Sequence, residues 1–336
     1  NWFKLRGTKG TSYRAPALFE SNLSPTTGFL ASTIDPCDSY GAKNPNTTLY
    51  KNCNAEVKDT TFISRNGVQV NTVGGKDAGL KSEQSDAETI GVVFQPTLPA
   101  RYGDFSFAVD WWKIQVNDQI DQVGGQGILN LCYNDPQFRA GGSYCSFVAP
   151  RVSGQALVVT DSYINIATQI VSGWDFNTRY SIELGTGRFT GDFRATRYIR
   201  QDDKTLPTDP LNRRNGNLFA PKWVADADLR YEWKDWTFRY GIEYYGKMDS
   251  YAFYDEDPAT SVFALATDAY TEQAVSVRYK NSKNKWDITA GVRNMTDAKP
   301  RDISSGITNL RRGNALMYSG YDFYGRAFFV NISKTL

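Results

Sequence analysis

Residues 223–233, WVADADLRYEW, alternate apolar and polar side chains, with Val224 as the one exception in the polar phase. After a connection of two residues, residues 236–245, WTFRYGIEYY, do the same. Alternation with a period of two is the pattern of a β-strand with one apolar face. Two such runs joined by a short turn predict a β-hairpin. This hairpin decides the fold class, because the same pattern recurs along the chain and predicts an all-β protein.

The two faces of this hairpin differ strongly. The polar face carries too many charges for a dry core, namely Asp226, Asp228, Arg230, Glu232, Arg239 and Glu243. The apolar face begins and ends on tryptophan on the first strand, at Trp223 and Trp233. An apolar band bordered by aromatic residues, opposite a charged face, is typical of a transmembrane β-barrel with a wet lumen. A soluble sheet packed on one side is the alternative interpretation of this hairpin.

About ten strands are expected, and the lengths of their connections alternate. Short connections near 97–102, 185–186, 235 and 282–284 alternate with long ones near 15–83, 121–162, 203–221, 250–268 and 298–324. All long loops should therefore lie on one rim, as in bacterial outer-membrane barrels. The expected strands are 1–14, 84–96, 103–120, 163–184, 187–202, 222–234, 236–249, 269–281, 285–297 and 325–336.

One expected strand is irregular. In FSFAVDWWKIQV, residues 105–116, the apolar phase changes between Trp111 and Ile114. This change predicts either a β-bulge or a strand that continues beyond the bilayer.

Composition excludes several classes of function. The chain has 336 residues, of which 40% are hydrophobic and 14% aromatic, and no stretch approaches the ~18 apolar residues of a membrane helix. The net charge is +2 and is spread along the chain, which argues against nucleic acid as a partner. The chain contains no histidine, so catalytic triads and histidine-bound zinc are excluded. We therefore expect neither an enzyme nor a bound cofactor.

The four cysteines fall in two of the long loops. Local pairing joins Cys37 to Cys53 and Cys132 to Cys145, one of three possible connectivities. Such disulfides fit an oxidising compartment. A zinc site of four thiolates is the alternative, but the spacings contain no C-x2-C pair.

Several segments resemble TonB-dependent outer-membrane receptors, in matching order along essentially the whole chain. They are LRGTKGTSYRAPALFE (5–20), FAVDWWKIQVNDQI (107–120), NIATQIVSGWDF (165–176), GVRNMTDAKP (291–300) and the closing YDFYGRAFFVNISKTL (321–336). In GVRNMTDAKP, Met295 stands where the family usually has leucine.

This resemblance implies a plugged barrel of about 22 strands in the bacterial outer membrane. Residues 1–336 would be the C-terminal portion of that single barrel domain, with the N-terminal plug and the earlier strands absent from the sequence. The expected partners are membrane lipid or lipopolysaccharide, and the TonB complex through the missing plug. Six charged residues are expected to face the lumen or plug: Asp226, Arg230, Arg239, Glu243, Arg278 and Arg293.

The resemblance also implies energised uptake of a scarce, large solute. Ligand contacts are expected from the aromatic and basic residues of the long loops, with Tyr40, Tyr50, Tyr133, Tyr144, Tyr251, Tyr254, Arg311 and Arg312 as candidates. Tyrosine rings offer apolar faces for sugars or flat chelators, and arginines can meet an anionic ligand. An iron–siderophore is the first expectation for the solute and an oligosaccharide the second. A passive porin or a structural barrel is the alternative class.

Overall fold

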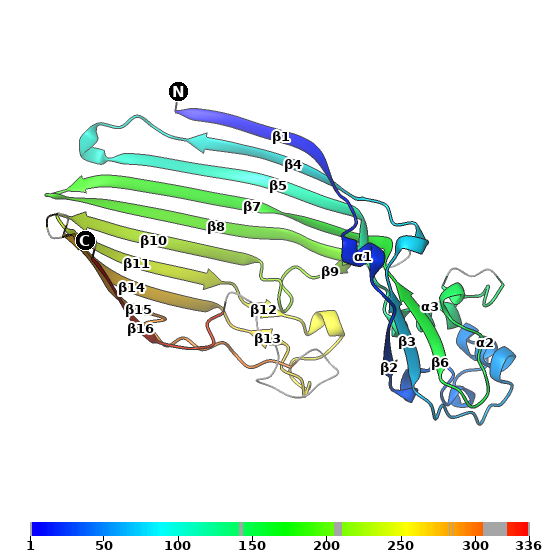
Figure 1. Cartoon of the computed structure of the whole chain (residues 1–336). Coiled ribbons are helices and arrows are strands. Elements are labelled where there is room, and N and C mark those ends of the chain that lie inside the picture. Colours follow the sequence, from blue (N-terminus) through cyan, green and yellow to red (C-terminus); the bar gives the residue numbers. More distant parts are fainter. Residues whose placement is uncertain are drawn as a thin grey trace.

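The computed structural model describes residues 2–140, 144–204, 210–281, 283, 285–304 and 321–334. Ten long strands form one antiparallel sheet, in which each strand pairs with its neighbours along the chain (Figure 1). They are β1 (Phe3–Arg14), β4 (Glu83–Phe94), β5 (Asp104–Asp121), β7 (Ile164–Leu184), β8 (Gly187–Lys204), β10 (Trp223–Trp233), β11 (Trp236–Tyr245), β14 (Tyr270–Asn281), β15 (Trp286–Arg293) and β16 (Ala327–Lys334). The predicted barrel-type architecture and all ten predicted strands are confirmed.

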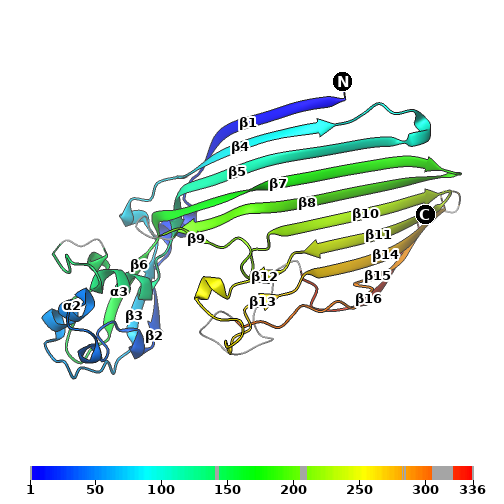
Figure 2. The same ribbon diagram turned by 180° about the vertical axis from the view of Figure 1, so that it is seen from behind.

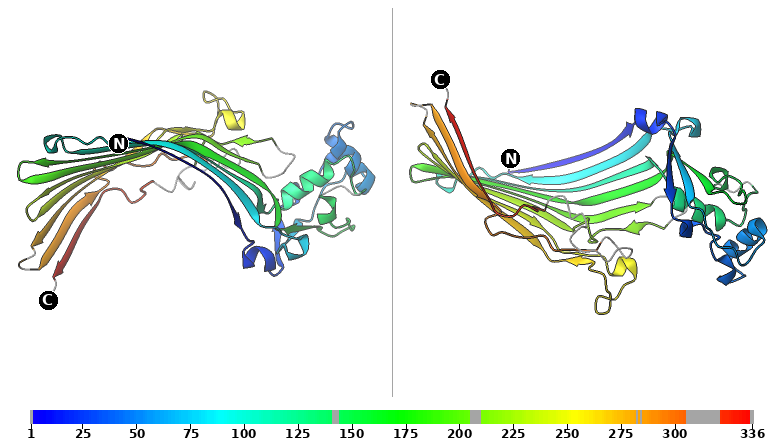
Figure 3. Two further views of the ribbon diagram at one scale, coloured as in Figure 1. Left: turned by 90° about the horizontal axis from the view of Figure 1, so that it is seen from above. Right: turned by 60° about the horizontal axis from the view of Figure 1, so that its bottom comes forward.

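The sheet is strongly curved, with β1 and β16 as its two edges (Figure 3). The short connections lie at one end of the strands together with both chain ends, and the long connections lie at the other end (Figure 1). Two tight turns use left-handed backbone at their first central residue, Gly185 with φ 61° and Lys234 with φ 52°. Such turns match the twist of antiparallel hairpins.

Two of the long connections are folded, which the sequence did not predict. They contribute a second sheet of β2 (Thr26–Leu30), β3 (Val68–Val73) and β6 (Leu157–Ser162), in which β3 runs antiparallel to β2 and parallel to β6. The helices α2 (Thr48–Val57) and α3 (Gly125–Tyr133) lie beside this sheet (Figure 2). We call residues 26–73 and 123–162 the outer module. Its parallel pair joins two loops that are separated by the β4–β5 hairpin.

The remaining elements are short. They are α1 (Leu18–Asn22), β9 (Asn212–Arg213), β12 (Met248–Asp249), β13 (Ala266–Thr267) and the 3-10 turns Ser32–Ile34, Tyr40–Ala42, Lys76–Ala78, Ala100–Tyr102, Cys145–Phe147 and Ala252–Tyr254. Among the helices of the described residues, none has the length and apolarity of a membrane span.

For the irregular strand β5, the structure contradicts the predicted β-bulge between Trp111 and Ile114. The β5–β7 register is regular from Asp104 through Val116, so no bulge lies between Trp111 and Ile114. The register instead shifts between Val116 and Ile120, where Asp118 has a φ of 53°. The apolar phase changes because Trp112 and Ile114 lie on the opposite face from Trp111 in a strand that continues for 18 residues.

Candidate functional site

The convex face of the curved sheet has two aromatic belts. Trp111, Trp174 and Trp223 lie in one cross-strand row near the long loops, and Trp233, Trp236 and Tyr279 lie in another near the short turns. Trp233 follows Trp223 by ten positions, which is roughly 33 Å along a strand. At the usual strand tilt of about 40° this corresponds to an apolar band roughly 25 Å high, the height of the lipid-facing band of outer-membrane barrels.

The opposite, concave face is charged and hollow. A hollow of about 1020 Å³ lies against β4 through β16, and its lining includes Asp226, Arg230, Arg239, Glu243 and Arg293. These are five of the six residues predicted to face the lumen. The sixth, Arg278, shares the face by register and pairs with Asp287. The structure therefore brings the predicted set onto one face.

Ion pairs cross this concave face from strand to strand. Arg230 and Arg239 stand directly opposite each other in the β10–β11 ladder. Asp228 lies between them, accepts a hydrogen bond from Arg239 and is 3.5 Å from the Arg230 guanidinium. This carboxylate offsets the repulsion that two facing like charges would otherwise produce.

Sequence reasoning missed part of this wall. Arg194 reaches Asp226 at 2.9 Å, and Arg179 reaches Asp192 at 3.4 Å. Glu243 lies directly opposite Asp226 and Glu272 in the strand register. Alternation within residues 176–184 and 188–202 was a usable signal for Arg179 and Arg194, because both share the phase of the polar face. Within the described part of the chain, no three acidic or cysteine side chains gather as metal ligands.

The outer module has its own core, in which both disulfides are buried. Cys37 bonds to Cys53 and Cys132 bonds to Cys145, as local pairing predicts. The same core contains Val68 of β3 and Val159 of β6, and both of these side chains are fully buried. Because β3 and β6 come from different loops, both loops supply residues to one shared core.

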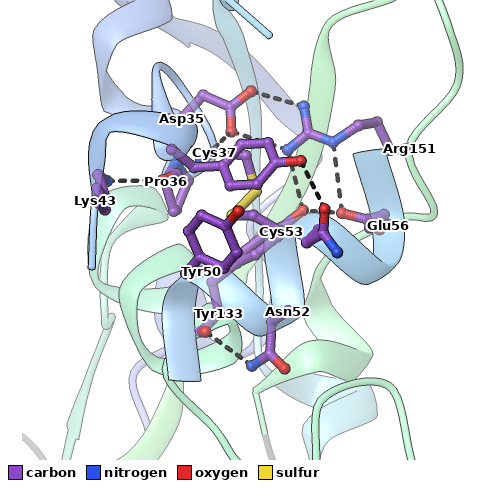
Figure 4. The surroundings of a disulfide bond; sticks show 12 residues. Asp35, Pro36, Cys37, Lys43, Tyr50, Asn52, Cys53, Glu56, Tyr133 and Arg151 are labelled. Atoms are coloured by element: carbon purple, nitrogen blue, oxygen red, sulfur yellow. Dashed lines mark hydrogen bonds and ion pairs between the residues drawn. A yellow bond between two sulfur atoms is a disulfide. The ribbon is translucent and has the colours of Figure 1, made fainter. Parts of the chain in front are cut away.

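Arg151, whose side chain is 13% exposed, joins the two loops through charge (Figure 4). Arg151 donates two hydrogen bonds to Asp35, at 2.7 and 2.8 Å, and one to the Tyr133 hydroxyl at 3.1 Å. Glu56 lies 3.4 Å from the same guanidinium and accepts a hydrogen bond from Arg139 at 2.7 Å. The Asp35 side chain is only 1% exposed, so this pair is desolvated on the carboxylate side.

The structure corrects the prediction that two of the loop tyrosines contact a ligand. Tyr40 and Tyr133 are completely buried in the outer module, and burial raises the pKa of each phenol. Their rings pack the core because the loops that hold them fold together. They are therefore inaccessible to a ligand in this structure.

The other ligand candidates are half-buried or lie elsewhere. Tyr50 packs edge-on against Tyr40, with ring centroids 5.4 Å apart, and Tyr144 lies near Phe147. In the loop between β11 and β14, Tyr251 donates a hydrogen bond to the Phe263 carbonyl at 3.0 Å, and Tyr254 packs against Phe253. Arg311 and Arg312 lie outside the described residues.

Two of the motif segments have clear structural roles. Arg14, at the end of β1, holds Glu20 through two hydrogen bonds of 2.9 Å and also binds Glu83. The Arg14 guanidinium and the Ala17 N–H hold the pKa of Glu20 below its usual range. Arg14 therefore fixes the point at which the strand enters the outer loops.

The second motif turns the chain between β15 and β16. Asn294 is fully buried, donates to the Ala298 carbonyl at 2.9 Å and accepts from the Ala298 N–H at 2.7 Å. Asp297 accepts from the Arg326 N–H at 3.0 Å. Gly325 has a φ of 75°, and a Cβ there would meet the Asp297 carboxylate at 2.7 Å. These contacts set the start of the last strand.

We predict that the Cys37→Ser/Cys53→Ser double variant loosens the outer module without dissolving the sheet. This disulfide joins cysteines that are 16 residues apart. Its loss is expected to lower the stability of the module by about 3 kcal/mol. Hydrogen exchange followed by mass spectrometry should show faster exchange in residues 26–73 and 123–162, with unchanged exchange in β10 and β11. Unchanged protection of the module would contradict a stabilising role for this disulfide.

The fold and faces define a class. A curved antiparallel sheet with a lipid-type convex face, a charged concave face and all long connections at one end is the wall of an outer-membrane β-barrel. The chain belongs to a particular family of these. The family model described as "TonB dependent receptor-like, beta-barrel" matches residues 1–295, so the chain is a member of this family. Proteins of the family are receptors and transporters built as barrels of the outer membrane.

Solved structures support the same fold. A ferric enterobactin receptor mutant, PfeA of Pseudomonas aeruginosa, superimposes with a TM-score of 0.56 and 15% identity, over 98% of this chain and 38% of that one. The siderophore receptor PirA of Acinetobacter baumannii gives a TM-score of 0.55 and 16% identity, over 99% and 39%. The chain therefore spans less than two fifths of the length of these relatives. No curated protein matches the sequence.

Proposed function

We propose that the chain forms the C-terminal ten strands of a larger plugged barrel that imports a scarce, large solute across the bacterial outer membrane. The TonB complex would drive import by acting on an N-terminal plug. The observation that carries the proposal is the charged concave hollow of about 1020 Å³, opposite a lipid-type face. A hollow of this size suits a large solute or a plug segment, since ordinary ligand pockets are about 300–1000 Å³.

An iron–siderophore is the proposed solute. The supporting comparison is with receptors described as ferric enterobactin and siderophore receptors, one of them in complex with enterobactin. The arginines of the concave wall would supply charge-assisted hydrogen bonds to an anionic chelate. The same wall would also hold the plug through such bonds.

A neutral oligosaccharide is the second candidate, and one observation favours it. The hollow is lined by five arginines and five carboxylates: Arg179, Arg194, Arg230, Arg239, Arg293, Asp192, Asp226, Asp228, Glu243 and Glu272. Such a lining has no net charge and would not attract an anion at long range. Hydroxyl-rich solutes need paired donors and acceptors, which this wall offers.

Uptake by cells that carry the intact receptor tests the proposal. Radiolabelled ferric siderophore should accumulate in these cells and should not accumulate when either the receptor or TonB is deleted. Arg239→Gln, in the wall, should reduce uptake several-fold, whereas Arg188→Gln, on the same face near the short turns and paired with Glu183, should leave it unchanged.

Three other outcomes separate the alternatives. Uptake that persists without TonB would contradict active transport and indicate a porin. TonB-dependent uptake of a labelled oligosaccharide, but not of ferric siderophore, would support the second candidate. Failure to take up either solute would contradict both.

A further inference from the structure

The dipeptide Asn-Gly occurs twice in the chain, at Asn66–Gly67 and at Asn215–Gly216. Asparagine is a thermolabile residue, and its reactivity depends on the residue that follows it. The main-chain nitrogen of that residue can attack the carbonyl carbon of the asparagine side chain. A following glycine leaves this approach open because it has no Cβ. The structure separates the two dipeptides, since it leaves the reacting groups of one free and holds those of the other.

The first dipeptide lies at the edge of the outer module, in the bend directly before β3, where Asn66 is exposed. The backbone carbonyl of Asn66 accepts a hydrogen bond from the Ser64 hydroxyl at 3.2 Å. Among the residues that the structure describes, neither the Asn66 side-chain amide nor the Gly67 N–H has a hydrogen-bond partner. The side chain of Asn66 can therefore turn toward the Gly67 nitrogen without breaking a contact.

The fold itself requires glycine at position 67. Leu30 of β2 pairs with Val68 of β3. A Cβ on Gly67 would lie 2.6 Å from the Leu30 carbonyl oxygen, which is closer than a van der Waals contact. Because β2 passes so close, a larger residue cannot replace this glycine while the pairing is kept. The open approach to Asn66 is thus a consequence of the way β2 and β3 pair.

The second dipeptide lies in the turn between β9 and β10, and its reacting groups are bound. The Asn215 amide donates hydrogen bonds to the carbonyls of Tyr198 and Ile199, at 3.1 and 2.8 Å. Its side-chain carbonyl accepts a hydrogen bond from Gln201 at 3.1 Å. The N–H of the following glycine donates to the Ala220 carbonyl at 2.7 Å. Reaction at this dipeptide therefore has to break several hydrogen bonds first.

We propose that Asn66 is a site of spontaneous deamidation in the folded receptor, which converts it to isoaspartate and aspartate. After base removes the Gly67 N–H proton, the nitrogen attacks the Cγ of Asn66. The new N–Cγ bond forms, the Cγ–Nδ2 bond breaks, and the side-chain nitrogen leaves as ammonia. Water then opens the cyclic imide at either carbonyl. Water is the only co-reactant, and nothing is oxidised or reduced. The modification is independent of the transported solute.

The products change the module at the point where β2 meets β3. Both products add a negative charge at an exposed position. Isoaspartate also adds a carbon atom to the main chain directly before Val68, which is fully buried and pairs with Leu30. We therefore expect the isoaspartyl form to loosen the β2–β3 pairing.

Ageing of the intact receptor tests the site. Purified receptor is incubated in mildly alkaline buffer and digested in heavy-oxygen water, which labels any conversion that occurs during digestion. Mass spectrometry should show deamidation in the peptide that contains Asn66, and isoaspartyl methyltransferase should methylate this peptide. Reaction at Asn215 should be roughly thirtyfold slower, because at least two hydrogen bonds must break before the ring closes.

Asn66→Gln is the matched variant. It keeps an amide at this position, but the glutamine would have to close a larger ring. The signal should disappear from this peptide and remain unchanged at Asn215. In the aged wild type, hydrogen exchange in β2 should be faster than in the aged variant. Equal exchange in the two proteins would contradict the expected loosening.

Incubation in guanidinium chloride separates the effect of the fold from that of the local sequence. Because both sites are Asn-Gly, the unfolded receptor should react at similar rates at Asn66 and Asn215. Equal rates at the two sites in the folded receptor would overturn the proposal. Reaction at Asn66 only after unfolding would overturn it as well, because the fold would then protect this site too.

Discussion

Replacing Arg151 with methionine is expected to unfold the outer module while the barrel wall remains folded. The substitution keeps most of the side-chain volume but leaves Asp35, which is 1% exposed, without its cation. Removing one partner of a buried ion pair typically costs about 3–5 kcal/mol. The loss also removes the donor to Tyr133 and the cation beside Glu56. Proteinase K should therefore cleave within residues 26–73 and 123–162 much faster than in the wild type.

Arg65→Met provides the matched control for this experiment. Arg65 is an exposed arginine of the same module, so its loss should leave the cleavage rate unchanged. If Arg151→Met resisted proteinase K as long as the wild type, the charge network would not hold the two loops together. Cleavage that extended into β10 and β11 would instead show that the module and the wall unfold as one unit.

Placing arginine at Leu229 is expected to destabilise the wall itself. Leu229 lies on the convex face of β10, about midway between the two tryptophan belts, and 37% of it is exposed. A charge at the middle of the lipid-facing band typically costs about 2–4 kcal/mol. Urea unfolding of the intact receptor in lipid vesicles, followed by tryptophan fluorescence, should show a loss of this size in the free energy of unfolding.

Ala108→Arg introduces the same charged residue on the other face. Ala108 lines the charged hollow, where water remains in contact with the side chain, and the expected cost is less than about 1 kcal/mol. Equal destabilisation by the two variants would contradict the assignment of the convex face to lipid. A larger cost for Ala108→Arg would indicate that the faces are reversed.

The outer module shows how far loop residues can be assigned from sequence. Tyr40 and Tyr133 belong to a residue type that often contacts ligands in loops, but both side chains are buried in the core of the outer module. The cysteine pairs were visible, and the β-branched runs at Val68–Val73 and Leu157–Ser162 were a usable signal for two further strands. Their parallel pairing was not visible, because it joins segments about 90 residues apart with a hairpin of the wall between them.

The sequence by itself determined the wall. A period of two assigns every side chain of a strand to one of two faces. The ten strands, their antiparallel pairing and the charged face therefore followed from the local pattern, as the hairpin at residues 223–245 illustrates. Only the tertiary structure decided where two loops meet and where a single extra residue, Ile199, turns Arg200 to the side of Arg197. The physical reason is range: alternation is a property of neighbours along the chain. The pairing of distant strands, the burial of Arg151 between loops and the phase shift of a bulge depend on partners that the local pattern does not contain.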